Sequence, residues 1–222
     1  WSSDVCSSDL VPNNVFVIDS MRSFKDTEIN FTIKDFFLLL KIMFCEFIGI
    51  RAKKAFISDF GYIYTYLKKA ILLSNKFKSI IDYKSIDLFY SFWLDENALI
   101  LSVLKYKGDI LSFFSRAHGY DLYDERRPNN YIPFKYFIVK NCSTVFTVSK
   151  SGEKYLKSQF PFKNINSSYL GVFDKGKNPL TNTGQFVIVS CSMLIPLKRV
   201  ELIIRSEEHT SELQSQFRIS YA

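Results

Sequence analysis

Short apolar runs alternate with longer segments of helical periodicity along most of the chain. The runs at residues 86–92, 109–114 and 144–148 have the length and the β-branched or aromatic content of buried strands. The segments at residues 95–106 and 133–141 have the length and spacing of helices. This strand–helix–strand rhythm predicts an α/β fold in which helices cover a parallel sheet.

Further predicted elements extend this pattern in both directions. Residues 14–18 form a short β-branched run, residues 58–74 a helix, and residues 166–170 a last short strand. Asp95 and Ser149 stand where an N-cap is expected, the second before a helix that ends near residue 159. The rhythm is therefore maintained through most of the first 170 residues.

Residues 33–50 form the longest apolar segment of the sequence. Four charged residues, Lys34, Asp35, Lys41 and Glu46, interrupt it. Its unbroken apolar stretches are thus much shorter than the ~20 residues of a membrane-spanning helix. We expect a buried or interfacial helix here.

The two ends of the chain differ from the rest. Residues 1–10 and 206–222 resemble translated sequencing-adapter sequence and are left out of fold reasoning. They contain five acidic residues and one basic residue, so without them the formal net charge rises from +7 to +11. The remaining sequence is basic, with the hydrophobic and charged content of a globular protein.

Composition divides that remaining sequence into two predicted domains. Residues 11–173 form a first domain, which we expect to be incomplete at its start. Residues 174–184 are rich in Asn, Thr, Gly and Pro and are predicted to be a linker. Residues 185–205 then read as the first strand, loop and helix of a second domain.

Seven ionisable side chains follow the predicted strand at residues 109–114. A strand that leads into a polar loop is where an open α/β sheet binds its ligand, because ligands collect at the carboxyl ends of the strands. His118 is either a turn residue before Gly119 or a ligand contact. Arg116 either pairs with Asp121 or Asp124, or contacts an anionic acceptor.

Other polar features allow a structural reading as well as a functional one. The charged run at residues 124–127 is either a solvated loop or the rim that meets an acceptor. Ser149 is predicted to cap a helix, whose start could also receive an anion. Cys45, Cys142 and Cys191 lie in apolar runs without the spacing of a metal site, which predicts buried free thiols.

The order of these segments resembles a known family. It comprises a strand, then Ser-Arg-Ala-His-Gly-Tyr-Asp at residues 115–121, a helix opening at residues 131–134, and a strand followed by a capped helix at residues 145–156. Residues 189–200 are similar to the first strand and phosphate loop of a donor-binding domain. Together these segments are similar to glycosyltransferases of family 4, which have the GT-B fold of two Rossmann-like domains.

The resemblance implies a retaining transfer of a sugar from a nucleotide-sugar donor, with no metal and no other cofactor. It implies that His118 is catalytic and faces the cleft, and that Lys198 binds the donor diphosphate. Arg116, Tyr120 and Asp121 become candidates for acceptor or cleft contacts. Met193 stands where the family usually has an Arg that also stabilises the diphosphate. We expect this chain to be a fragment that is inactive by itself.

The family also suggests partners. Its acceptors are glycans or lipid-linked molecules of cell-surface polysaccharide or glycolipid synthesis, often in bacteria. We therefore expect a cytoplasmic protein that contacts the anionic inner face of the cytoplasmic membrane. The basic residues expected to mediate that contact are Lys53, Lys54, Lys68, Lys69, Lys76 and Lys78.

Several other functions lack sequence support. No recognition helix or RNA-binding signature accompanies the lysines, so we expect no nucleic-acid partner. There is no nucleophile elbow, no phosphate-binding P-loop and no dinucleotide fingerprint. The alternative that remains open is a non-catalytic module that binds a glycan or nucleotide on a degenerate glycosyltransferase-like fold, which Met193 favours.

Overall fold

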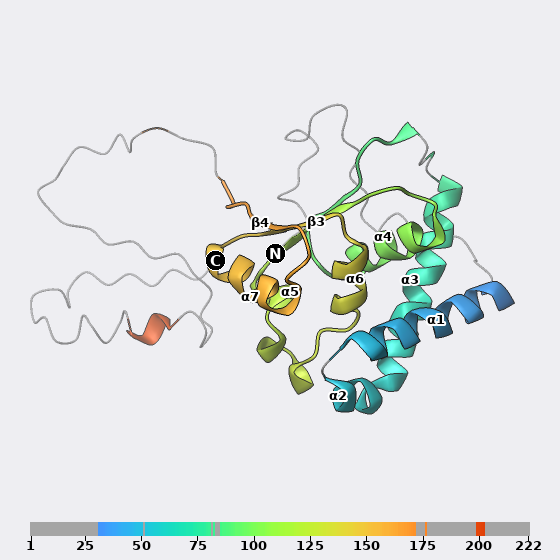
Figure 1. The fold of residues 1–222 in the computed structure, drawn as a ribbon, viewed down its shortest axis with the longest axis horizontal. Coiled ribbons are helices and arrows are strands. Elements are labelled where there is room, and N and C mark those ends of the chain that lie inside the picture. Colours follow the sequence, from blue (N-terminus) through green and yellow to red (C-terminus); the bar gives the residue numbers. More distant parts are fainter. Residues whose placement is uncertain are drawn as a thin grey trace, which may run out of the picture. The chain divides into compact units, whose positions relative to one another are not determined.

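The computed structural model describes residues 31–50, 52–80, 82, 85–171, 176 and 199–202. Its contacts divide the chain into two compact units, residues 1–172 and 173–222. All the elements discussed below belong to the first unit (Figure 1). Several sequence predictions lie outside the described residues: the strands at 14–18 and 186–191, the linker at 174–184, Lys198, Met193 and Cys191.

Four parallel strands form the sheet, in the same order in space as along the chain. Register pairs Ser91 with Ser115, Phe114 with Thr144, and Val145 with Ile165. This confirms the predicted α/β fold, a Rossmann-like parallel sheet flanked by helices. The strands are β1 (Tyr90–Ser91), β2 (Phe114–Ala117), β3 (Thr144–Thr147) and β4 (Ile165–Ser167).

Helices connect these strands and precede them. Among the described residues, three helices precede the sheet, and three follow β1, β2 and β3 as parts of the crossovers. A short helix and two 3₁₀ turns lie in the β2–β3 connection. The helices are α1 (Ile33–Gly49), α2 (Lys53–Ser58), α3 (Phe60–Ile80), α4 (Glu96–Lys107), α5 (Gly119–Leu122), α6 (Lys135–Asn141) and α7 (Lys150–Gln159). The 3₁₀ turns are η4 (Asp124–Arg126) and η5 (Pro128–Asn130).

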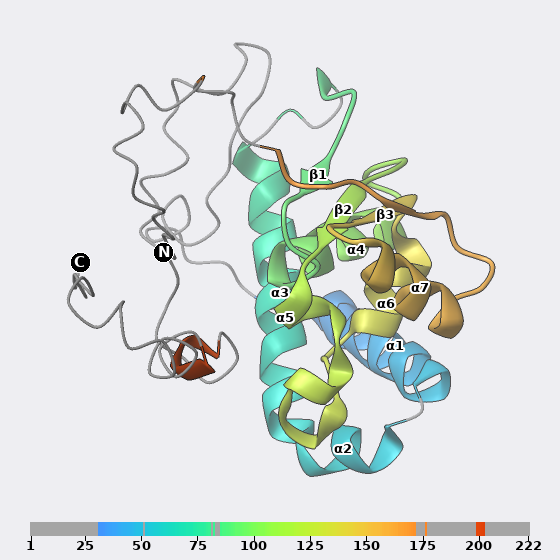
Figure 2. The ribbon, with the colours of Figure 1, turned by 90° about the vertical axis from the view of Figure 1, so that its left-hand side faces the viewer.

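The two faces of the sheet differ in burial. Because the strands follow chain order, right-handed crossovers place their helices on one face. Side chains on that face, such as Ala117, Val145 and Thr147, are buried, whereas Arg116 and Phe146 on the other face remain half-buried. Helices α1 and α3 pack onto α4 and α6, so that unit 1 has two helical layers beside the sheet (Figure 2).

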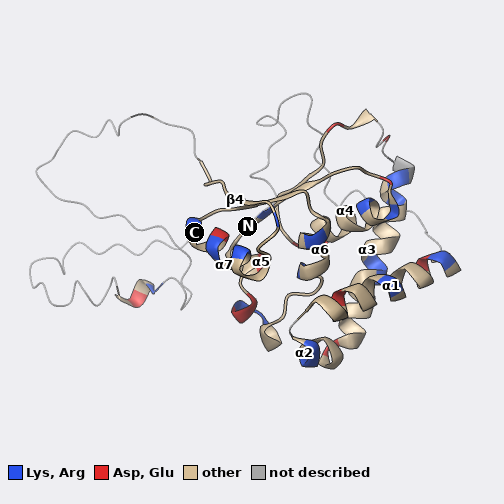
Figure 3. Ribbon diagram, in the orientation of Figure 1, with Lys and Arg blue, Asp and Glu red and all other residues tan. Residues whose placement is uncertain are grey.

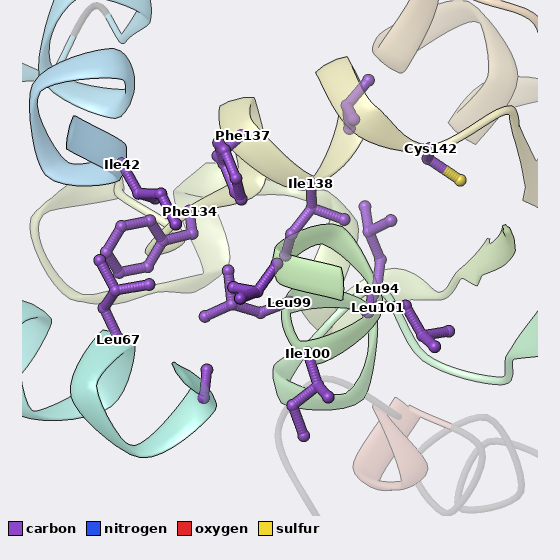
Figure 4. Close-up of a cluster of buried hydrophobic side chains, with 14 of the residues drawn as sticks. Ile42, Leu67, Leu94, Leu99, Ile100, Leu101, Phe134, Phe137, Ile138 and Cys142 are labelled. Carbon is purple, nitrogen blue, oxygen red and sulfur yellow. The ribbon is translucent and has the colours of Figure 1, made fainter. Parts of the chain in front are cut away.

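The hydrophobic core lies between these helical layers. In α4 every residue from Ala98 to Leu104 is buried, because α3, α6 and β1 surround it. Figure 4 shows Ile42 of α1, Leu67 of α3 and Phe137 of α6 converging on α4. Burying each such large side chain stabilises the fold by ~1.5–3 kcal/mol. The core therefore fixes how the helices are arranged around the sheet.

Most predicted helix limits are close to the observed ones. Helix α1 matches the prediction for residues 33–50. The Asp95 carboxylate accepts from Asn97 N at 3.2 Å, and the Ser149 hydroxyl accepts from Gly152 N at 3.1 Å, which confirms both N-caps. The prediction of one helix at residues 58–74 was wrong in extent, because α2 precedes it and α3 continues to Ile80.

The strand limits needed larger corrections. Strand β2 begins at Phe114, the last residue of the predicted strand, so the first residues of the predicted polar loop are strand. The reason is the end of α4, where Gly108 adopts φ = +79° and Asp109 N donates to Leu104 O. After this helix end the chain must return to the sheet before its backbone can pair with β1 and β3, and pairing begins at Phe114. Strand β1 is likewise limited to Tyr90–Ser91.

Glu46 joins α1 to the start of α6. Its carboxylate accepts hydrogen bonds from Phe137 N at 2.7 Å and from the Tyr131 hydroxyl at 3.2 Å. The side chain is fully buried, and burial raises its pKa to about 8. Glu46 also lines a cavity of about 160 Å³, together with Lys135 and Asp124. Helix α1, predicted as a buried or interfacial helix, is thus anchored through a buried polar group.

We expect Gly49→Ala to destabilise the chain by ~2 kcal/mol through overpacking. A Cβ at Gly49 would lie 2.0 Å from Cε1 of the Tyr136 ring, too close for any real contact. In a Tyr136→Ala background the same change should be neutral or stabilising, because Ala favours helix over Gly. Urea unfolding of the four variants tests this, and equal effects of Gly49→Ala in both backgrounds would contradict it.

No helix among the residues that the structure describes is both long and apolar enough to cross a membrane. Helix α1, which covers Ile33–Gly49, has 17 residues.

Candidate functional site

The candidate site lies at the carboxyl ends of β1 and β2. Phe92 and Trp93 follow β1 directly, and His118 follows β2 directly. The hydroxyls of Ser91 and Ser115 donate to Trp93 O at 2.6 and 3.1 Å, which fixes the backbone of the first loop. Since neighbouring parallel strands end at the same edge, the two loops meet there, as the sequence predicted for His118.

The His118 ring packs against the two aromatic side chains of the neighbouring loop. Its centroid lies 4.1 Å from that of Trp93 and 4.9 Å from that of Phe92. The residue is only 8% exposed, and neither ring nitrogen has a hydrogen-bond partner among the described residues. Buried polar nitrogens without a hydrogen-bond partner are rare in folded proteins, which makes His118 the candidate for contact with a further group.

The electrostatic surroundings favour the neutral form of His118. Burial lowers the pKa of its imidazole, and the nearby Arg116 charge lowers it further. The Asp121 carboxylate lies 3.9 Å from His118 Nδ1, too far for a hydrogen bond. A neutral imidazole offers one N–H donor and one nitrogen acceptor, which suits a ligand hydroxyl.

Asp121 holds the two loops together. It is 1% exposed, and its carboxylate accepts from Leu94 N at 2.7 Å and from His118 N at 2.5 Å. Burial raises its pKa to about 6 in spite of these hydrogen bonds. The structure therefore gives Asp121 a positioning role, and its contact with an acceptor or the cleft stays a prediction.

Phe92 and Trp93 are site residues that the sequence reasoning missed. Trp93 is 40% exposed and Phe92 is 52% exposed, and their rings meet edge to face at 6.0 Å. The available signal was an aromatic pair directly after a predicted strand, but the prediction had extended the strand through Phe92. Their exposed faces can stack against an apolar ring or the apolar face of a sugar.

Arg116 lies beside the loops, on the open face of β2. Its Nη2 donates to the Ser168 hydroxyl at 3.1 Å, and it also interacts with the Tyr90 hydroxyl. It makes no ion pair with Asp121 or Asp124 in the described part of the chain, so that proposed pairing is wrong. Its buried Nε has no hydrogen-bond partner among those residues.

Tyr120 lies at the solvent edge of the site. Its side chain is 59% exposed, and the Arg127 guanidinium stacks 3.5 Å from its ring centroid. Arg127 Nε also donates to Tyr120 O at 3.2 Å. Tyr120 is therefore a rim residue, held by one end of the charged run at residues 124–127.

The other end of that run is structural. The Asp124 carboxylate accepts from Lys135 Nζ at 2.5 Å and from Gln159 Nε2 at 3.1 Å, and burial lowers the pKa of Lys135. The charged run at residues 124–127 is thus not a freely solvated loop, and only part of it lies at the rim of the site.

Metal-binding groups and disulfides are not part of this arrangement. Among the residues that can be described, no three His, Cys, Asp or Glu side chains come together as a metal site requires. Cys45 and Cys142 are free thiols, and burial raises the pKa of Cys142 to about 11.

Comparisons with protein-family models, curated proteins and solved structures found no match for this chain.

Proposed function

We propose that this chain carries the acceptor-side part of a retaining glycosyltransferase of the GT-B type. The observation that supports this most is His118, a neutral imidazole with two unpaired nitrogens at the carboxyl edge of a parallel sheet. Such a group can donate to or accept from a sugar hydroxyl. The sequence resemblance over residues 86–204 supplies the reaction class.

Each residue has a defined role in this proposal. His118 contacts the transferred sugar in the cleft, and Trp93 and Phe92 present aromatic faces beside it. Lys198 binds the donor diphosphate, where positive charge offsets the negative charge that grows as the glycosidic bond breaks. The reaction would need no metal, because this lysine and backbone N–H groups would stabilise the leaving group.

The proposed partners follow from the same chemistry. The donor is a nucleotide sugar, and the acceptor is a glycan or a lipid-linked molecule of polysaccharide or glycolipid synthesis. Such acceptors place the protein in the cytoplasm, at the inner face of the cytoplasmic membrane. A non-catalytic module that binds glycans or nucleotides is the second candidate, and Met193 favours it because a diphosphate cation is replaced by an apolar side chain.

The test begins with the uninterrupted gene, read upstream of residue 11 and beyond residue 205. The expected result is a complete donor domain with the two glutamates, seven residues apart, that bind donor in the resembling family. In that protein His118→Ala should lower kcat/KM for sugar transfer by ~10–100-fold, the effect of one or two lost hydrogen bonds to substrate. Chromatography of nucleotide-sugar consumption measures it.

The control is Lys157→Ala, which removes an ion pair with Glu153 on α7 and no group assigned to the site, and it should leave kcat/KM unchanged. The protein could also have a complete donor domain and yet show no turnover. If it then bound the donor and His118→Ala weakened that binding, the non-catalytic binding module would be favoured. If His118→Ala kept both full activity and full donor binding, the assignment of His118 to the site would be refuted.

A further inference from the structure

Five large apolar side chains form a stripe on the outer face of α1. Their spacing of four, three, four and four residues places them on one side of the helix. Each is 46–69% exposed, although α1 also buries an apolar face against α3 and α6. We call these residues the outer stripe: Ile33, Phe37, Leu40, Phe44 and Ile48.

Helix α1 is therefore apolar on two opposite sides. Leu39, Ile42 and Met43 on the inner side are almost fully buried in the core. A helix that is hydrophobic all round is stable in water only if both sides are covered. Contiguous exposed apolar surface of this kind marks an interaction site.

The charged residues of α1 are sorted between the same two sides. Asp35 and Glu46 are buried on the inner side, whereas Lys34 and Lys41 are exposed. Lys53 and Lys54 at the start of α2 are exposed too. Figure 3 shows these basic positions recurring along α1 and α2. Helix α1 and the start of α2 thus carry four exposed lysines, and α1 presents no carboxylate on the side of the outer stripe.

This charge pattern distinguishes between two partners that could cover the outer stripe, a second copy of the chain and a lipid bilayer. A second copy of the chain joined about a two-fold axis would bring together two patches that both carry lysines and whose α1 helices offer no carboxylate to pair with them, which is unfavourable. A bilayer of anionic lipid accepts both features at once, since apolar side chains enter the acyl boundary while lysines reach the headgroups. We propose that the outer stripe is the surface by which this chain docks on an anionic membrane.

The surface shares Lys53 and Lys54 with the basic cluster expected from the sequence but does not include the lysines of α3. Lys69 pairs with Glu96 at 2.8 Å, Lys78 pairs with Asp109 at 2.6 Å, and Lys76 is buried. Those lysines of α3 stabilise the fold. The membrane surface is instead assigned to α1 and the start of α2, which specifies the membrane contact of the proposed function.

The experiment measures flotation of the full chain with vesicles of phosphatidylcholine alone or mixed equally with phosphatidylglycerol. We expect binding to the mixed vesicles, weakened by 0.5 M salt. Phe37→Ser/Phe44→Ser should reduce the partition coefficient at least tenfold for each Phe. Lys34→Gln/Lys41→Gln should reduce it about fivefold per lysine on mixed vesicles only.

The matched control is Leu111→Ser/Phe162→Ser, which removes two side chains that are 94% and 99% exposed outside α1. It should leave flotation unchanged, and circular dichroism melts should show that every variant is folded. The assay needs no turnover, so failure of this proposal and failure of the transferase proposal are seen separately.

Either of two results would overturn the proposal. The first is that Phe37→Ser/Phe44→Ser leaves vesicle binding intact, or weakens it only as much as the control Leu111→Ser/Phe162→Ser does. The other is absence of vesicle binding, and a dimer in light scattering that the same variant dissociates would then assign the surface to a second copy.

Discussion

At pH 9 the Glu46→Gln variant is expected to be more stable than the unmodified protein. Its advantage in free energy of unfolding should be about 3 kcal/mol larger at pH 9 than at pH 6. Burial raises the pKa of Glu46 from 4.5 to about 8. The stability that the protonated group contributes is full below pH 4.5 and is lost as the pH rises to about 8. Above that, the folded state must hold a buried anion, whereas Gln stays neutral.

The glutamine preserves the local contacts. Its carbonyl can accept from Phe137 N, and its amide can donate to the Tyr131 oxygen, so that α1 and α6 remain joined. Urea unfolding followed by circular dichroism at pH 6, 7.5 and 9 measures the difference in free energy of unfolding.

Glu153→Gln is the control for this experiment. Glu153 lies on the surface and accepts from Lys157 and Lys150, which lower its pKa to about 2. Its contribution to stability is present above pH 4.5 and lost as the pH falls to about 2, so the alkaline slope should be unchanged. If Glu46→Gln kept the slope of the unmodified chain, Glu46 would be ionised in the folded state at neutral pH.

Asp121→Ala is expected to destabilise the chain by about 3 kcal/mol and to release Trp93 from His118. The change leaves the N–H groups of Leu94 and His118 buried without an acceptor, at ~1–3 kcal/mol each. Trp1 and Trp93 are the tryptophans of the sequence, so in a Trp1→Phe background the emission reports the site alone. We expect a changed emission spectrum before global unfolding begins.

A second aspartate provides the comparison. Asp59 accepts one exposed hydrogen bond from Asn129 Nδ2 at 3.0 Å, and Asp59→Ala should alter stability by no more than ~0.5 kcal/mol. It should not alter Trp93 emission. Similar stability losses in the two variants, with identical emission, would show that Asp121 does not hold the loops.

The elements that local sequence defines were predicted well. Helix α4 begins after the Asp95 cap and ends at Gly108, two signals within the segment itself. Helix α7 likewise follows the Ser149 cap. The limits of β1 and β2 were predicted poorly, because a strand begins where its partners allow pairing. For β2 those partners are β1 and β3, which are separated from it in sequence.

The sequence located His118 of the candidate site at the sheet edge, but it did not show what the residues around it do. A polar loop after a buried strand located His118 at the sheet edge, since parallel strands end together. The functions of its neighbours could not be assigned in the same way. Asp121 and Arg116 are as polar as His118, and Phe92 had been placed in the predicted strand at residues 86–92.

The sequence by itself determined the rhythm of strands and helices, the helix caps and the position of His118 after a strand. These depend on apolar spacing and on side chains that bind their own backbone, which act over a few residues. Only the tertiary structure decided which polar groups are satisfied and which apolar faces are covered. Asp121 is satisfied by Leu94, 27 residues away, whereas the ring nitrogens of His118 and the outer stripe of α1 lack such partners in the described chain. Long-range packing supplies these partners, and no local pattern encodes it.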